Sequence, residues 1–225
     1  MKKTILGVLV LVPLMEALAL AQVPTADAKE GKLYLEGGIG FGVASMAGPS
    51  TASKGFDAIP LFDIGAAAEY GITEQFGGLV KIGLGLGLSD DPGTLGFGMM
   101  FDGAYKFVER KGDSPALTGY AGLGFTHLAI DPKGPGDDDA TDFVFEAGVQ
   151  ADFGSDDLSF QPFMGFQLVG GSRPFKAYNG VLQVVAGAKL LLKLADNLFL
   201  EPSITFLGGN FQDQVVFGIG IQLRL

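Results

Sequence analysis

Apolar side chains alternate with glycine or polar side chains along most of this chain. The pattern is clearest in Leu35–Val43 (LEGGIGFGV), Lys81–Leu88 (KIGLGLGL) and Val215–Leu225 (VVFGIGIQLRL). Successive side chains of a β-strand point to opposite faces of the sheet, so each segment would have one apolar face and one glycine or polar face. The alternation therefore predicts a protein built from β-strands whose sheet is apolar on one side.

About ten such strands are expected, each near the ~9–11 residues that a tilted strand needs to cross a bilayer. Their ranges are 32–44, 58–72, 78–88, 94–107, 116–130, 142–153, 158–169, 181–192, 198–207 and 215–225. With one exception on each side, the connections after odd-numbered strands are long and those after even-numbered strands are short. Membrane barrels have this asymmetry, with long loops outside and short turns in the periplasm. The sequence therefore predicts an all-β, closed, antiparallel up-and-down transmembrane β-barrel.

The N-terminal sequence MKKTILGVLVLVPLMEALALA predicts a secretory signal peptide. Lys2 and Lys3 form a positively charged start, Ile5–Leu14 is apolar, and Ala19-Leu20-Ala21 supplies the small residues of a cleavage site. The apolar run is too short for a membrane-spanning helix. The expected organisation is a signal peptide at 1–21, a polar lead-in at 22–31 and a barrel domain at 32–225.

Residue parity places the apolar side chains on the outer face of the barrel. On four strands this outward set is Leu35, Ile39, Phe41, Val43, Leu95, Phe97, Met99, Phe101, Tyr105, Phe107, Phe143, Phe145, Val149, Phe153, Leu182, Val184, Leu190 and Leu192. Charge is nearly absent from it, as lipid contact requires, because a charge at the bilayer midplane costs roughly 2–4 kcal/mol. A soluble barrel or sandwich would instead turn these side chains inward, and a soluble periplasmic ligand-binding β-barrel remains an alternative.

Composition narrows the function classes further. The chain has no cysteine, which excludes a lipid-anchored lipoprotein and any disulfide, so closure of the sheet would have to supply stability. Its net charge of −10 and the lack of a basic stripe argue against a nucleic-acid partner. The mean hydropathy of +0.35 is high for a soluble secreted domain and fits strands that bury alternate side chains in lipid.

The last strand resembles the C-terminal strand of bacterial outer-membrane barrels, which carries apolar residues at its final position and at every second position before it. Here these residues are Phe217, Ile219, Ile221, Leu223 and Leu225, where the family usually ends in Phe or Trp. With the signal peptide and the alternating strands, the mature chain resembles a small outer-membrane β-barrel of the OmpA/OmpX-like class. The resemblance implies a Gram-negative cell outer membrane, insertion by the outer-membrane assembly machinery, contact with lipopolysaccharide and a monomeric state.

Inward-facing positions near the expected periplasmic end carry ionic and amide side chains at one level. The charged residues at or just below this level are Glu36, Glu69, Lys81, Lys106, Asp152, Lys189, Glu201 and Arg224, and the uncharged ones are Tyr120, Gln150, Gln161 and Gln222. Four acids face four bases, and unpaired buried charge is costly. We therefore expect these groups to pair as an ionic plug of the lumen.

Glycine dominates the inner positions above that level. The set is Gly38, Gly40, Gly42, Gly83, Gly85, Gly87, Gly96, Gly98, Gly122, Gly124, Gly218 and Gly220. An eight-strand barrel is already about wide enough for side chains to fill it, so a glycine-lined barrel with more strands would leave space. This predicts a vestibule open to the outside. The alternative is that the glycines serve strand curvature and that long neighbouring side chains fill the lumen.

Catalytic and metal chemistry is weakly represented. His127, in FTHLAI, is the single histidine, and Ala129 stands where a lipid A deacylase of this membrane would place serine. The ten-strand outer-membrane proteases need histidine together with several aspartates at the outer rim, and no such motif surrounds His127. The acidic stretch 131–142 would bind Ca²⁺ or bridge lipopolysaccharide through divalent cations, or it is a solvated loop. We expect no enzyme activity and no cofactor.

These observations leave two membrane functions open. The first is a structural barrel, or one that binds a small ligand or surface partner, with the plug and vestibule described above. The second is a narrow porin-like channel for small solutes, which a conductance measurement would distinguish from the first.

Overall fold

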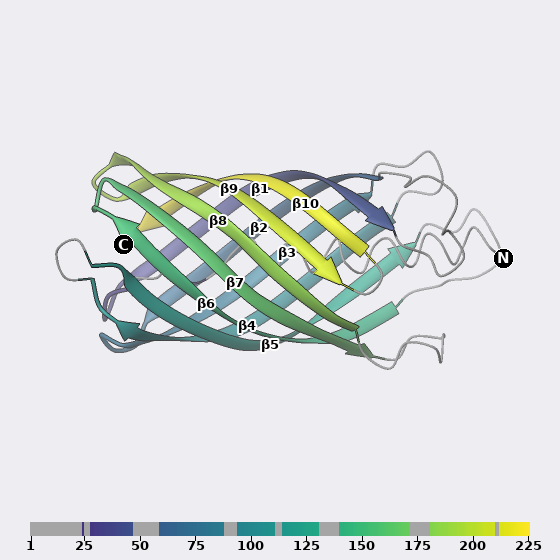
Figure 1. Ribbon diagram of the computed structural model, residues 1–225, viewed down its shortest axis with the longest axis horizontal. Coiled ribbons are helices and arrows are strands. Elements are labelled where there is room, and N and C mark those ends of the chain that lie inside the picture. Colours follow the sequence, from purple (N-terminus) through teal and green to yellow (C-terminus); the bar gives the residue numbers. More distant parts are fainter. Residues whose placement is uncertain are drawn as a thin grey trace.

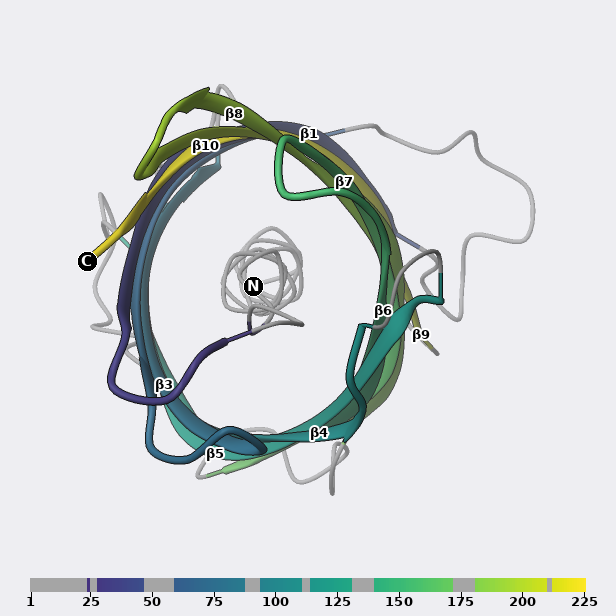
Figure 2. The ribbon, with the colours of Figure 1, turned by 90° about the vertical axis from the view of Figure 1, so that its left-hand side faces the viewer.

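In the computed structural model, the chain forms one closed barrel of antiparallel strands (Figures 1 and 2). The structure describes residues 24, 28–46, 59–87, 94–110, 114–130, 140–171, 181–209 and 212–225. The ten strands are β1 (Leu33–Met46), β2 (Ile59–Gly71), β3 (Phe76–Gly87), β4 (Thr94–Val108), β5 (Ala116–Ile130), β6 (Ala140–Gly154), β7 (Leu158–Gly171), β8 (Val181–Ala195), β9 (Leu198–Gly209) and β10 (Gln212–Arg224). Each strand pairs with its neighbours in sequence, and β1 pairs with β10 to close the wall.

All ten predicted strands and their up-and-down order are confirmed, and the differences lie at strand ends. Strand β3 begins at Phe76 rather than at residue 78, because Phe76 and Gly77 already pair with Tyr105 and Ala104 of β4. Strand β10 begins at Gln212 rather than at residue 215. Its Gln214 is buried on the inner face, so a polar residue that suggests a loop in the sequence belongs to the alternating pattern.

The predicted outer face is confirmed. Large apolar side chains point away from the barrel, with exposed fractions as high as 71% for Phe143 and 65% for Leu123. The C-terminal residues Phe217, Ile219 and Ile221 share this outer face. A soluble barrel would bury these side chains and expose the polar ones, so the soluble periplasmic alternative does not fit this distribution. Aromatic pairs such as Phe41 and Phe62, with ring centroids 4.9 Å apart, pack side by side on the outer wall.

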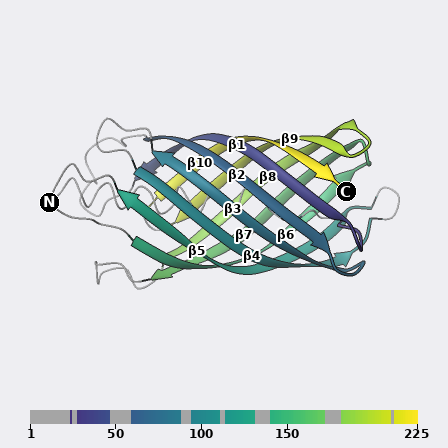
Figure 3. The same ribbon diagram turned by 180° about the vertical axis from the view of Figure 1, so that it is seen from behind.

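The connections differ between the two ends of the barrel. At one end the strands are joined by the short turns 72–75, 155–157 and 196–197, and the C-terminus lies at this end (Figure 3). The strand ends that flank 47–58, 131–139 and 172–180 lie at the other end, and these three connections are outside the described residues. Within the described residues, no helix is long and apolar enough to cross a membrane.

Candidate functional site: the polar lumen

The inner wall of the barrel carries nearly all of the buried polar and charged side chains. They include Asp63, Glu69, Lys81, Asp102, Lys106, Glu146, Gln150, Asp152, Gln161, Gln167, Lys189, Glu201 and Gln222. The period of two sends them inward as their neighbours turn outward, so the sequence pattern that makes the lipid face also makes this lumen. Side chains from different strands then meet inside.

One cluster extends across the lumen from β3 to β7. The Lys81 ammonium on β3 lies 2.7 Å from Oδ2 of Asp102 on β4, and it also forms an ion pair and hydrogen bond with Oε1 of Glu146 on β6. On β7, Nε2 of Gln167 donates to the other oxygen of Glu146 at 3.1 Å. The Lys81 and Glu146 side chains are wholly buried. A single lysine therefore connects two acids that belong to non-adjacent strands.

A second cluster lies against the opposite part of the wall. The Lys189 ammonium on β8 lies 2.6 Å from Oε1 of Glu201 on β9 and 3.7 Å from Oε2 of Glu36 on β1. Two carboxylates thus share one ammonium group. Acidic side chains therefore outnumber ammonium groups in this cluster, which borders the cavity described below.

A third polar group lies near the short-turn end. Asp152 on β6 accepts hydrogen bonds from Oγ of Ser159 at 2.5 Å and from Nε2 of Gln161 at 2.9 Å. Arg110, which follows β4, forms an ion pair with the same carboxylate, and Gln150 donates to Gln161 at 2.9 Å. These contacts join β4, β6 and β7 at the end of the barrel.

The lead-in also contacts this end. The backbone carbonyl of Ala28 accepts a hydrogen bond of 3.1 Å from the Lys106 ammonium on β4. The backbone of Gly31 donates to the Gly71 carbonyl at 2.8 Å, and a Cβ at Gly71 would overlap the Lys29 carbonyl. Only glycine at position 71 therefore leaves room for the chain to pass this close to β2 before it enters β1.

The residues expected to form the ionic plug all belong to the inner wall or its short-turn end, but they divide among several groups. Lys189, Glu36 and Glu201 meet as described, whereas Lys81 pairs with Asp102 and Glu146, which do not belong to the expected set. The early start of β3 explains this, because it places Lys81 farther from the short-turn end than expected. The inward parity of Asp102 and Glu146 was the available signal.

The remaining plug residues have other partners. Asp152 belongs to the third group, and Lys106 contacts the lead-in. The Arg224 guanidinium stacks over the ring of Phe199, with its central carbon 3.9 Å from the ring centroid, and donates to Gln222 at 2.9 Å. Glu69 is buried on the inner face of β2.

The inner glycines fall into two kinds. A Cβ at Gly122 would overlap Oδ1 of Asp102, and a Cβ at Gly124 would overlap Sδ of Met100, so neighbouring side chains already fill these positions. At Gly42 a Cβ would lie 2.9 Å from Cγ2 of Val216. Four further glycines of the expected vestibule, Gly83, Gly85, Gly96 and Gly98, are buried on the inner face of β3 and β4.

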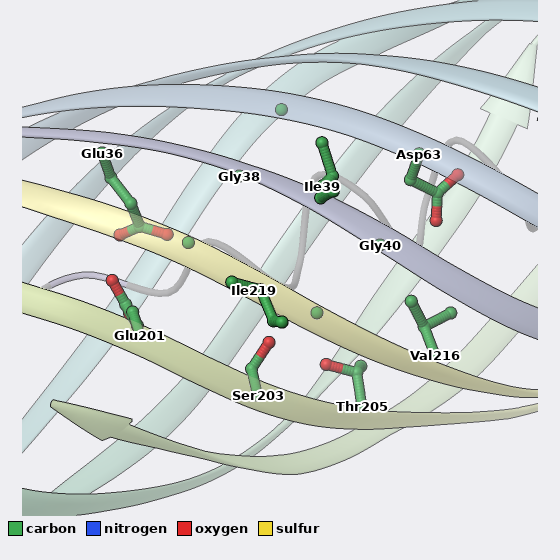
Figure 4. Close-up of a pocket in the computed structure, with 13 residues that line it drawn as sticks. Glu36, Gly38, Ile39, Gly40, Asp63, Glu201, Ser203, Thr205, Val216 and Ile219 are labelled. Carbon is green, nitrogen blue, oxygen red and sulfur yellow. The ribbon is translucent and has the colours of Figure 1, made fainter. Parts of the chain in front are cut away.

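The second kind lines an open cavity of about 50 Å³ between β1, β2, β9 and β10 (Figure 4). Its glycines are Gly38, Gly40, Gly65, Gly218 and Gly220, and its polar residues are Glu36, Asp63, Glu201, Ser203 and Thr205. The cavity is therefore acidic, with a flat glycine surface between its polar groups.

Comparisons with known proteins agree with this architecture. No protein-family model and no curated protein matches the sequence. Among solved structures, the translocator domain of the autotransporter NalP from Neisseria meningitidis aligns with a TM-score of 0.53 at 10% identity, covering 96% of this chain and 93% of that chain. The outer-membrane protease OmpT from Escherichia coli aligns with a TM-score of 0.51 at 6% identity, covering 91% and 100%. The β domain of the Bordetella autotransporter BrkA gives 0.51 at 12% identity, covering 88% and 100%.

This chain has the outer-membrane β-barrel fold. The identities are so low that the likeness concerns the fold alone, and the neighbours include two autotransporter domains and a protease. The closed antiparallel wall and its apolar outer face agree with this assignment independently of any neighbour.

Two candidate chemical sites of the outer-membrane barrel receive little support. Nδ1 of His127 on β5 shares a hydrogen bond of 2.9 Å with Oγ1 of Thr141 on β6, at the long-loop end of the wall. Most of the acidic stretch 131–142 lies outside the described residues, and its last member, Asp142, is buried on the inner face. Among the described residues, no group of three or more histidine, aspartate or glutamate side chains is arranged to hold a metal ion.

Proposed function

We propose that this chain is a structural or ligand-binding outer-membrane barrel whose lumen is closed to solutes by buried ion pairs across its interior. The observation that carries the proposal is the ion pair between Lys81 and Glu146, which joins non-adjacent strands through the interior. An open pore would hydrate these charges separately on its wall, whereas here the ammonium is wholly buried between two carboxylates. Breaking such a pair to open a water path is costly.

The barrel would have a defined orientation in the outer membrane. The signal peptide would direct the chain through the inner membrane, the assembly machinery would insert it, and the short turns would face the periplasm. The longer connections would then face outward among lipopolysaccharide, and the barrel would act as a monomer. The asymmetry of connection lengths supports this orientation.

The vestibule of the proposal is restricted to one side of the lumen. The cavity against β1, β2, β9 and β10 supports it there, because five glycines line it and a Cβ at Gly220 would have no neighbour closer than 3.5 Å. The space that Gly122 and Gly124 leave on β5 is occupied by the side chains of Asp102 and Met100 from β4. The ligand-binding part of the function is therefore assigned to the cavity.

A narrow channel is the second candidate, and the same cavity is the observation that favours it. A solute path would have to pass Lys189, Glu36 and Glu201 at the cavity's end. Liposome swelling distinguishes the candidates. A closed barrel gives no swelling with a small sugar above that of protein-free liposomes, and a channel gives rapid swelling.

The proposal assigns no catalytic role to this barrel. His127 is its single histidine, and it bonds to a threonine hydroxyl at an exposed position of the wall. A serine or threonine nucleophile needs a base that is itself oriented by a third group. Incubation with peptide and lipid A substrates should give no turnover, and any turnover that His127→Ala abolishes would overturn this part.

The absence of cysteine allows a direct test of location and orientation. Thr141→Cys places a thiol on an exposed residue at the long-loop end, and Asp157→Cys places one in an exposed short turn. In intact cells a membrane-impermeant maleimide should label the first variant only, and after outer-membrane permeabilisation it should label both. Labelling of Asp157→Cys in intact cells would contradict the orientation. Detergent-free release of the protein would contradict the membrane location.

A further inference from the structure

One acidic side chain of the cavity has no ion-pair partner among the described residues. Asp63 on β2 is 3% exposed, and neither of its carboxylate oxygens has a hydrogen-bond partner within the described part of the chain. On the β9 side, the Thr205 hydroxyl is also buried and without such a partner. Both residues line the same cavity. Because buried polar groups are normally hydrogen-bonded, the unpartnered Asp63 carboxylate indicates a ligand that supplies donors.

The acidic side chains of the cavity indicate the sign of the ligand's charge. Lys189 at one end is shared by Glu36 and Glu201, so this end has one carboxylate more than it has ammonium groups. Figure 4 shows these two carboxylates at one end of the cavity and Asp63 at the other. With Asp63 added, the lining has more acidic side chains than ammonium groups. A cation bound at either end of the cavity would compensate for this excess.

The surface between the charged groups is built from paired glycines. In the strand register, Asp63 is opposite Gly40, Gly40 is opposite Gly218, and Gly218 is opposite Ser203. Two residues along the strands, a second row of inward-facing positions pairs in the same way through Gly65, Gly38, Gly220 and Glu201. With adjacent strands ~4.8 Å apart, the glycines separate the polar residues at the two sides of the cavity and leave a shallow floor between them.

The volume of the cavity and the arrangement of its oxygen atoms distinguish between types of cation. At ~10–15 Å³ for each water centre, 50 Å³ corresponds to roughly four waters, which is enough for a cation with a short organic tail. A divalent metal needs several oxygen ligands around one point, and no described group of acidic or histidine side chains provides them. An ammonium group has three N–H donors, which is enough to satisfy both oxygens of the Asp63 carboxylate.

We infer that this cavity binds a small primary ammonium compound, with the ammonium at Asp63 and the short tail over the glycine floor. The inference rests on the proposed ligand-binding function and names its ligand class. A ligand of about three heavy atoms reaches roughly millimolar affinity at best, so binding is weak and is measured at high ligand concentration.

The test is a ligand-observed NMR titration of the protein, purified from outer membranes in a non-ionic detergent. Ethylamine is the probe, and tetramethylammonium is its matched control, because it carries the same charge and has no N–H donor. We expect saturable ethylamine binding in the millimolar range and at least about tenfold weaker binding of tetramethylammonium. Equal binding of the two would overturn the inference, since charge alone would then account for it.

Variants locate the site. Asp63→Asn should weaken ethylamine binding at least about tenfold, whereas Glu74→Gln, which removes one charge from an exposed turn, should leave it unchanged. Gly220→Ala should also weaken binding, since its methyl group enters the cavity at ordinary contact distances of 3.5 Å or more and should not disturb the fold. Unchanged binding in both Asp63→Asn and Gly220→Ala would overturn the assignment.

Folding and conductance are measured on the same preparations. Heat-modifiable migration on a gel shows whether each variant is folded, and unchanged binding in Gly220→Ala alone overturns the assignment if Asp63→Asn fails this check. If the unmodified protein binds no ethylamine and does not conduct, the ligand assignment fails and the closed-lumen proposal stands. If it conducts strongly, the closed-lumen proposal fails, and the binding comparison still decides whether Asp63 holds an ammonium.

Discussion

Lys81 on β3 and Glu146 on β6 form an ion pair inside the barrel, although β4 and β5 separate their strands in the wall. Asp102 on β4 completes the group at 2.7 Å from the same ammonium. The contact cannot form until these four consecutive strands are assembled, so it connects local pairing to the shape of the whole lumen. It also fills the interior where an open channel would need water.

Replacement of Lys81 should destabilise the barrel strongly. Lys81→Met leaves Asp102 and Glu146 buried without their cation, and loss of one partner from a buried pair costs about 3–5 kcal/mol. The chain has no tryptophan, so unfolding in urea is followed by circular dichroism and by the gel shift of the folded form.

Lys193→Met is the matched control. Lys193 lies in the exposed part of β8, 3.4 Å from Asp157 and 3.5 Å from Asp196, and solvent screens these pairs. Its replacement should therefore have little effect on unfolding. Equal losses in the two variants would contradict a buried ionic cluster at Lys81.

The two kinds of inner glycine should respond differently to alanine. At Gly187 a Cβ would overlap the Ile204 carbonyl and come within 2.5 Å of the Phe163 ring, so Gly187→Ala should cost roughly 1–3 kcal/mol through overpacking. At Gly220 the nearest atoms are 3.5 Å or more away, and Gly220→Ala should be nearly neutral for stability. The comparison uses urea unfolding, and the reverse order would contradict the assigned filling of the lumen.

Depth in the membrane should decide the effect of an arginine on the outer face. Leu123 lies at the middle of β5 and is 65% exposed, while Leu117 lies on the same face near the short-turn end. In lipid vesicles Leu123→Arg should cost roughly 2–4 kcal/mol and Leu117→Arg at most about 1 kcal/mol. An exposed leucine of a soluble barrel would tolerate arginine equally well at both positions, so equal tolerance would contradict a lipid-facing wall.

The sequence was sufficient for the wall of the barrel but not for its contents. Alternation with a period of two predicts all ten strands and the face of residues such as Phe101 and Phe143, because that pattern is local. To predict the partners of Lys81, the start of β3 had to be known, and the sequence pattern placed it at residue 78 rather than at Phe76. Because β3 starts two residues earlier than expected, the Lys81 side chain still points inward but lies at a different height in the lumen.

The hollow part of the lumen also could not be located from the sequence. Gly148 and Gly220 look alike as inward glycines, yet the Tyr120 hydroxyl occupies the space above Gly148, and the space at Gly220 belongs to the cavity. The difference depends on which side chain of a neighbouring strand leans over each glycine. That choice is made by three-dimensional packing rather than by the residue's own position in the pattern.

Planar-bilayer recording of the purified protein tests the closed lumen most directly. We expect no large stable conductance steps from the unmodified barrel, because the buried cluster of Lys81, Asp102 and Glu146 and the Lys189 group obstruct a water path. A folded Lys81→Ala, Glu146→Ala double variant should conduct more than the unmodified protein. Large, stable conductance steps from the unmodified protein, unchanged in the double variant, would contradict the account.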